Sequence, residues 1–139
     1  MRTLRALTGA AAAGAFAVLI TAAPAQAATD TYWLYTSDNC GIARFIDHGE
    51  GAPGGGPNDD YVEIYDACAD RDGVRAWAWL DGTLLGSRYN GEGFSTTVIW
   101  DPFGNIPDGG FMGIEVCIVD GPNDMVGFNC ESWNDFIEE

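Results

Sequence analysis

Asp72-Gly-Val-Arg-Ala-Trp-Ala-Trp-Leu-Asp-Gly-Thr-Leu-Leu-Gly-Ser-Arg-Tyr-Asn-Gly91 contains two apolar-rich runs that are bounded by Asp-Gly and Asn-Gly pairs. Such pairs favour the tight turns of β-hairpins, because their residues accept the positive φ angles that these turns require. The stretch therefore predicts a strand over 74–80, a turn at 81–82 and a second strand over 83–89 that pairs with the first.

Similar short runs occur along the rest of the chain, separated by Gly, Pro, Asn and Asp. They predict further strands over residues 31–36, 41–46, 61–65, 94–100 and 113–119. With the hairpin this makes about seven strands, and no internal repeat or linker divides them. The pattern favours one all-β domain, an antiparallel β-sandwich of Ig-like or Greek key type.

The alternation of side chains along a strand indicates which face is buried, because successive side chains point to opposite sides of the sheet. The strand over 113–119 has an aliphatic face made of Ile114, Val116 and Ile118. The strand over 61–65 has Val62 and Ile64 on one face. We expect both sets in the core.

The strand over 74–80 places Trp77 and Trp79 on one face, beside Arg75 and Asp81. We interpret one or both rings as part of the sandwich core, which a Trp on a central strand often fills. The alternative is an outward pair that stacks on sugar rings or on a partner, with Arg75 and Asp81 as polar neighbours.

Residues 1–27 have the features of a secretory signal peptide. Arg2 and Arg5 precede an Ala-rich apolar run, and Pro24-Ala-Gln-Ala27 ends in the small-x-small pattern that signal peptidase cleaves. We expect cleavage before Ala28 and a secreted, extracellular domain over 28–139. The apolar run is short and ends at a proline, so we expect no permanent membrane span.

The chain is strongly acidic. Its 139 residues include 6 basic and 21 acidic side chains, for a net charge of −15. The expected signal peptide holds two of the arginines and no acidic residue, so its removal lowers the charge to −17. This charge argues against binding to nucleic acid or anionic lipid, which require cationic side chains, and it favours cationic partner surfaces.

Four cysteines, an even number in an exported chain, predict two disulfides. They are Cys40, Cys68, Cys117 and Cys130, and none forms the close pair typical of zinc sites. Of the three possible pairings we favour Cys40–Cys68 and Cys117–Cys130, because each closes a loop between segments that are expected to be neighbours. We expect no bound metal and no cofactor.

Catalytic machinery is not evident. His48, the single histidine, lies in the Gly-rich segment 47–60, and oxidised cysteines offer no nucleophile for it to activate. We therefore expect a non-enzyme with no catalytic residue. The same segment carries Asp47, Glu50, Asp59 and Asp60, so a bound calcium ion is the alternative to a solvated acidic loop.

Aromatic residues concentrate near both ends of the secreted part. The first strand has Tyr32 and Leu34 on one face and Trp33 and Tyr35 on the other, and such a strand can add to the edge of a partner's sheet. In the tail, Trp133, Phe136 and Ile137 have the spacing of a short amphipathic helix, and packing within the domain is the alternative for both ends. The candidate partner-binding residues are Tyr32, Trp33, Leu34, Tyr35, Trp77, Trp79, Trp133 and Phe136.

Several runs resemble those of the small exported proteins of actinobacteria: Gly41-Ile-Ala-Arg-Phe45, Asp60-Tyr-Val-Glu-Ile-Tyr-Asp66, and Val116-Cys-Ile-Val-Asp120 followed by Phe128-Asn-Cys130. Within that class the chain is similar to the small bridging subunit of secreted umbrella-shaped toxin particles, which joins a lectin-bearing subunit to the large stalk-and-repeat subunit. The resemblance implies a two-disulfide β domain without catalysis that holds partners by a terminal strand and loops.

These observations together predict a secreted protein-binding adaptor, monomeric on its own, whose partners are other secreted proteins. Two alternatives remain. One is a secreted carbohydrate-binding module. The other is a protease inhibitor that presents residues 101–107, Asp-Pro-Phe-Gly-Asn-Ile-Pro, as a rigid exposed loop.

Overall fold

The computed structural model describes residues 31–47, 51–53 and 60–137, and all regular structure in these ranges is β. The expected signal peptide, His48, Glu50 and Asp59 lie outside the described residues. The eight strands are β1 (Thr31–Tyr35), β2 (Gly41–Ile46), β3 (Tyr61–Asp66), β4 (Gly73–Leu80), β5 (Thr83–Asn90), β6 (Thr96–Trp100), β7 (Phe111–Val119) and β8 (Phe128–Phe136). The all-β prediction is confirmed, with one strand more than expected.

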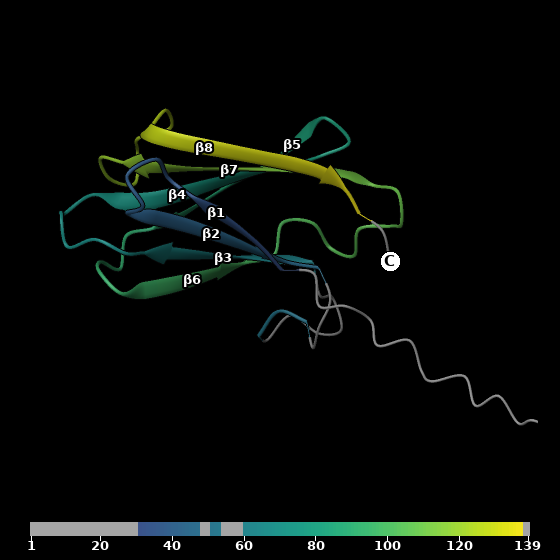
Figure 1. Ribbon diagram of the computed structural model, residues 1–139, viewed down its shortest axis with the longest axis horizontal. Helices are drawn as coiled ribbons and strands as arrows, with labels where there is room; N and C mark the ends of the chain where they lie inside the picture. The colour runs from purple at the N-terminus through teal and green to yellow at the C-terminus, as the bar shows by residue number, and fades with distance from the viewer. Residues whose placement is uncertain (1–30, 48–50, 54–59, 138–139) are drawn as a thin grey trace, which may run out of the picture.

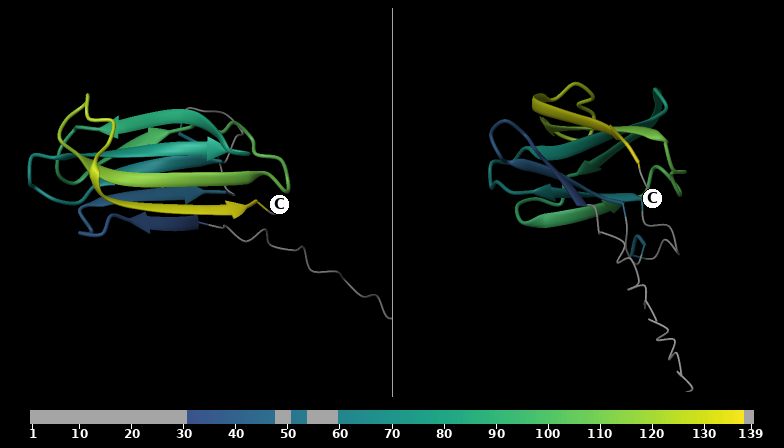
Figure 2. Two further views of the ribbon diagram at one scale, coloured as in Figure 1. Left: turned by 90° about the horizontal axis from the view of Figure 1, so that it is seen from above. Right: turned by 45° about the vertical axis from the view of Figure 1, so that its right-hand side comes forward.

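The strands form two four-stranded antiparallel sheets that pack face to face as a sandwich (Figures 1 and 2). The first sheet has the order β1-β2-β3-β6, and the second has the order β5-β4-β7-β8. The edge strands β1 and β8 lie along the same side of the sandwich, and the chain crosses between the sheets after β3, β5 and β6.

The hairpin between β4 and β5 forms as the sequence predicts. Leu80 pairs with Thr83, so the connecting turn is Asp81-Gly82. Both turn residues have positive φ, 49° at Asp81 and 78° at Gly82, as a two-residue hairpin turn requires.

The core lies between the two inner faces and confirms the predicted alternation. Val62 and Ile64 of the first sheet are fully buried against Ile114, Val116 and Ile118 of the second. The inner face of β4 is made of small residues, Val74, Ala76 and Ala78, which leaves room for the larger side chains of the opposite sheet.

The prediction that Trp77 or Trp79 fills this core is wrong, because the small face of β4 is the inner one. Both tryptophans lie on the outer face of the second sheet, where Trp77 is only 7% exposed. It is part of a second, smaller apolar cluster with Cys117 and Val119. The Arg75 guanidinium stacks over the Trp77 ring at 5.9 Å and donates a hydrogen bond to the carbonyl of Pro122, which holds the loop after β7 against this cluster.

The helix-like interpretation of the tail is also wrong. Residues 128–136 form β8, which pairs with β7 along its length. Trp133 points inward and packs against the core, whereas Phe136 is 62% exposed. The apolar spacing therefore reflects an edge strand with one inward tryptophan and a buried Ile137 just beyond its end.

Both predicted disulfides are confirmed: Cys40–Cys68 and Cys117–Cys130, so all four cysteines are paired. The first joins the start of β2 to the loop after β3, and the second joins neighbouring strands β7 and β8. No helix among the described residues is long and apolar enough to span a membrane.

Residues 101–107, the segment considered above as an inhibitor loop, are exposed at Asp101, Gly104, Asn105 and Pro107 and anchored at two apolar positions. Phe103 and Ile106 are buried in the core between the sheets. The Ile106 amide donates a hydrogen bond to the buried Asp60 carboxylate, which fixes this segment to the start of β3.

One polar side chain also joins the two sheets. Asn90, at the end of β5, is fully buried. Its amide nitrogen donates hydrogen bonds to the carbonyl oxygens of Ile64 and Thr96, both at 2.9 Å. Its amide oxygen accepts a hydrogen bond from the Glu92 backbone. Asn90 thus connects β5 of the second sheet to β3 and β6 of the first.

Candidate functional site

The outer face of the first sheet carries an exposed set of aromatic and aliphatic side chains that we call the aromatic face. The inward positions of its four strands fill the core, so the alternate positions face outward. These outward residues are Trp33 and Tyr35 of β1, Ile42 and Arg44 of β2, Glu63 and Tyr65 of β3, and Thr97 and Ile99 of β6.

Strand register aligns these side chains in two rows across all four strands. One row runs Trp33, Arg44, Glu63 and Ile99, and the next runs Tyr35, Ile42, Tyr65 and Thr97. Local sequence could indicate which residues of one strand share a face, but only the pairing of β1, β2, β3 and β6 brings the two rows together.

The centre of the aromatic face holds one ion pair. The Arg44 guanidinium forms a salt bridge with Glu63 and stacks over the Trp33 ring at 5.0 Å. Among the strand residues that define this face, Arg44 and Glu63 are the charged ones, so the face has no net formal charge. Each charge is already paired, which reduces the desolvation cost when a partner covers them.

The aromatic side chains at the β1 edge are open to solvent. Trp33 is 52% exposed and Tyr35 is 44% exposed, and their rings stack at 6.4 Å. A shallow groove runs beside them, lined by Trp33, Ile42, Arg44, Glu63, Tyr65 and Thr97. The sequence-predicted pair Trp33 and Tyr35 is therefore available for contact.

The other two predicted residues of β1 serve packing. Leu34 packs against the core, and the Tyr32 ring stacks on Trp133 of β8 at 4.3 Å. These contacts close the side of the sandwich where the two edge strands meet. β1 is thus an integral edge strand paired with β2, and its outer edge is the part that a partner strand could extend.

The remaining candidates lie on the second sheet. Trp77 is buried in the outer cluster, while Trp79 and Phe136 lie on the same outer face and are partly or largely exposed. The eight candidate partner-binding residues therefore do not form one site. They divide among the aromatic face, the β1–β8 side and the outer face of the second sheet.

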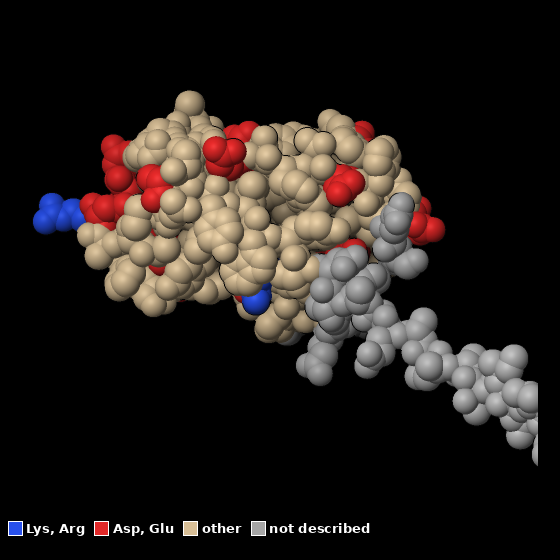
Figure 3. All heavy atoms as spheres, viewed as in Figure 1, with Lys and Arg blue, Asp and Glu red and all other residues tan. Residues whose placement is uncertain are grey.

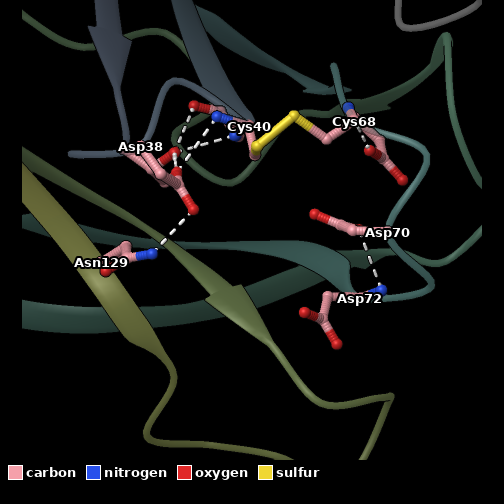
Figure 4. The surroundings of a disulfide bond; sticks show 9 residues. Asp38, Cys40, Cys68, Asp70, Asp72 and Asn129 are labelled. Carbon is pink, nitrogen blue, oxygen red and sulfur yellow. Dashed lines mark hydrogen bonds between the residues drawn. A yellow bond between two sulfur atoms is a disulfide. The ribbon is translucent and has the colours of Figure 1, made fainter.

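Acidic side chains gather at the end of the sandwich that lies at the left in Figure 3. At this end Asp38, in the turn before β2, points toward Asn129 of β8 (Figure 4). Burial by itself would raise the pKa of Asp38, but hydrogen bonds from Thr36 Oγ1, the Cys40 amide and Asn129 Nδ2 outweigh it and lower that pKa. Ionised Asp38 therefore helps to hold the two sheets together at this end.

The pKa of Asp66 is shifted in the opposite direction to that of Asp38. It is buried at the end of β3, where Oδ1 accepts a hydrogen bond from the Cys68 amide and Oδ2 has no hydrogen-bond partner. Burial raises the pKa of Asp66 above its ordinary value, and the negative charge of Asp70 raises it further. The contribution of Asp66 to stability is thus complete at low pH, and it is lost as pH rises through the folded-state pKa.

We expect Asp66→Asn to raise the thermal unfolding midpoint at neutral pH, because the amide keeps an acceptor for the Cys68 N–H and removes the buried charge. The gain should shrink when unfolding is repeated near pH 3, where Asp66 itself is largely protonated. Asp38→Asn is the matched variant with the opposite sign, and it should lower the midpoint at neutral pH. A lower midpoint for Asp66→Asn at neutral pH would contradict this account.

Metal ligands are not brought together by the described strands and loops. In the described part of the chain, each group of three potential ligands includes two disulfide sulfurs, Cys40 and Cys68 with Asp70, or Cys117 and Cys130 with Glu115. Disulfide sulfurs offer no thiolate to a metal ion. Of the acidic residues suggested for calcium, Asp47 and Asp60 are described, and both are buried.

No protein-family model, curated protein or solved structure matches this chain. The resemblance to bridging subunits of toxin particles therefore stays a prediction from the sequence.

Proposed function

We propose that this chain is a secreted, non-catalytic protein-binding domain and that the aromatic face is its interface. The observation that carries the proposal is the exposed aromatic face, which has no net formal charge on a chain of net charge −15. Trp, Tyr and Arg are the side chains that dominate the energetics of protein interfaces, and this face presents all three in adjacent positions.

The electrostatics support a protein partner of defined charge. Acidic side chains gather at one end of the sandwich (Figure 3), so a partner that covers the aromatic face and reaches this end would place its rim beside carboxylates. A partner with an apolar patch and cationic rim would gain in association rate and selectivity from this arrangement. The proposed partner is therefore another secreted protein with such a surface.

The adaptor role follows the sequence resemblance. A bridging subunit needs a rigid body with more than one accessible surface and needs no reaction centre. The sandwich with two disulfides supplies the rigid body, and its disulfides are compatible with an oxidising, extracellular environment. We therefore propose that the domain joins secreted proteins as one subunit of an extracellular toxin complex.

Replacing Trp33 and Tyr35 together by alanine should abolish capture of the native partner while leaving the fold intact. Both side chains are exposed at the face, so the unfolding midpoint should change little. Loss of two interface anchors should weaken binding by roughly 100-fold or more. The measurement is affinity purification of the tagged protein from culture medium with mass spectrometry, followed by titration of the captured partner.

Phe136→Ala is the matched control, because Phe136 is an exposed aromatic residue, 62% accessible, on the other sheet. It should keep the partner. If the Trp33 and Tyr35 variant captures the same proteins as the unmodified chain, the aromatic face is not the interface. Loss of the partner with Phe136→Ala alone would instead place the interface on the second sheet.

A further inference from the structure

The outer face of the second sheet contains a groove that the protein-binding proposal does not use. Trp79 of β4 forms one wall, Ser132 and Asn134 of β8 form the other, and Gly113 of β7 lies between them. Phe111 closes one end, where its ring meets Phe136 at 4.9 Å. We call this the Trp79 groove.

Gly113 creates the groove, and the backbone does not require glycine there. Gly113 is in the middle of β7 and is not among the glycines with positive φ. A Cβ at this position would meet Asn134 Cβ at 3.7 Å and Trp79 Cβ at 3.9 Å, which are ordinary van der Waals contacts. Glycine weakens a strand interior, and one feature it often marks is the close approach of a ligand.

The wall opposite Trp79 supplies hydrogen-bonding groups. Ser132 and Asn134 are exposed, and their side chains make no hydrogen bond within the described structure. The Ser132 hydroxyl and the Asn134 amide together offer donors and acceptors, and Glu115 pairs with Ser132 in the next row of the sheet. The groove thus has an apolar aromatic wall and a polar wall on either side of a bare backbone floor.

We propose that the Trp79 groove binds a neutral glycan chain. The C–H faces of a pyranose ring fit against the indole of Trp79, while its hydroxyls exchange hydrogen bonds with Ser132 and Asn134. The chain's net charge of −15 disfavours sulfated or otherwise anionic glycans, so the ligand class is uncharged pentose, hexose or N-acetylhexosamine polymers.

The site differs from the sugar platform that the sequence suggested. Trp77 is buried, and the Arg75 side chain is already bound to Ser87 and Pro122. Asp81 accepts a hydrogen bond from the Phe111 amide at 3.0 Å. Trp79 is therefore the ring that remains available, and its polar partners come from β8. Because the groove and the aromatic face lie on opposite sheets, the domain could hold a protein on one side and a glycan on the other.

The test is a titration of the disulfide-bonded protein with the neutral hexasaccharides of chitin, cellulose, xylan, mannan and laminarin. Binding is measured by calorimetry and by tryptophan fluorescence. At least one hexasaccharide should bind. Gly113→Val should weaken that binding by about tenfold or more, because its methyl groups fill the groove. The same variant should keep or raise the unfolding midpoint, since valine favours a strand. Trp79→Ala should also weaken binding, and Trp33→Ala on the other sheet should leave it unchanged.

Three other outcomes would overturn the proposal that the Trp79 groove binds a glycan. Absence of binding to all five hexasaccharides removes the ligand class. Binding that Gly113→Val leaves unchanged places the sugar elsewhere. If no glycan binds and Gly113→Val instead abolishes capture of a protein partner, the groove binds a polypeptide. The Trp33 and Tyr35 substitutions test the aromatic face separately, so failure of either proposal leaves the other standing.

Discussion

Reduction of both disulfides is expected to unfold the domain at room temperature. The bridges close loops between residues 28 and 13 apart in sequence. Cross-links of this span contribute about 3 to 4 kcal/mol each by restricting the unfolded chain. Net stabilities of small domains are about 5–15 kcal/mol, so the two bridges account for a large share.

The measurement is thermal and denaturant unfolding with and without a strong reductant, monitored by circular dichroism. Paired Cys→Ala variants that remove one bridge at a time separate the contributions. Removing Cys40–Cys68 should cost slightly more than removing Cys117–Cys130 on loop length alone, since its loop is longer. A midpoint that reductant leaves unchanged would show that the strands and core suffice without the bridges.

Turn chemistry made most strands predictable. The Asp81-Gly82 turn, with both φ angles positive, has the geometry that this pair of residues favours. The favoured disulfide pairing was also accessible, because each bridge joins segments that are close in sequence and adjacent in the fold. In both cases the determining interactions are local.

The two wrong structural predictions concern non-local partners. The spacing of Trp133 and Phe136 fits a helix, but β7 offers an unpaired edge and the chain extends it with β8. Trp77 was expected between the sheets because it is large and apolar. It lies outside because Val74, Ala76 and Ala78 occupy the inner face of β4, and on the outer face it packs with Cys117 and Val119 of β7. The residues near these tryptophans do not show that β7 is the strand that pairs with β8 and contributes to this outer cluster.

The candidate site has the same limitation. Trp33 and Tyr35 were identified as a pair because alternation within one strand places them on one face. Their neighbours Arg44, Glu63 and Tyr65 depend on the order of strands in the sheet, which short-range patterns do not determine. The signal that could have joined them was the shared alternation of residues 41–46 and 61–65, whose outward positions include Arg44, Glu63 and Tyr65.

Asn90 shows the same contrast between a local signal and a non-local role. Asn90-Gly91 predicts a turn, and Asn90 does end β5. The side chain, however, is 0% exposed and donates to carbonyl oxygens on two strands of the opposite sheet. A buried amide with both of its functional groups bonded links the sheets at a defined register.

Asn90→Asp is therefore expected to lower the free energy of unfolding by about 4 kcal/mol or more. The new carboxylate would be buried without a cation and would face the carbonyl oxygens of Ile64 and Thr96. Those two oxygens would also lose the hydrogen-bond donors that Asn90 supplies. The cost should diminish in acid, because burial raises the pKa of such a carboxyl and its protonated form can donate one hydrogen bond again. Asn105→Asp introduces the same charge in an exposed loop and should change the unfolding free energy by less than about 0.5 kcal/mol. Urea unfolding of both variants at neutral and acidic pH measures the difference. Equal unfolding free energies for the two variants at neutral pH would mean that the link between the sheets through Asn90 contributes nothing to stability.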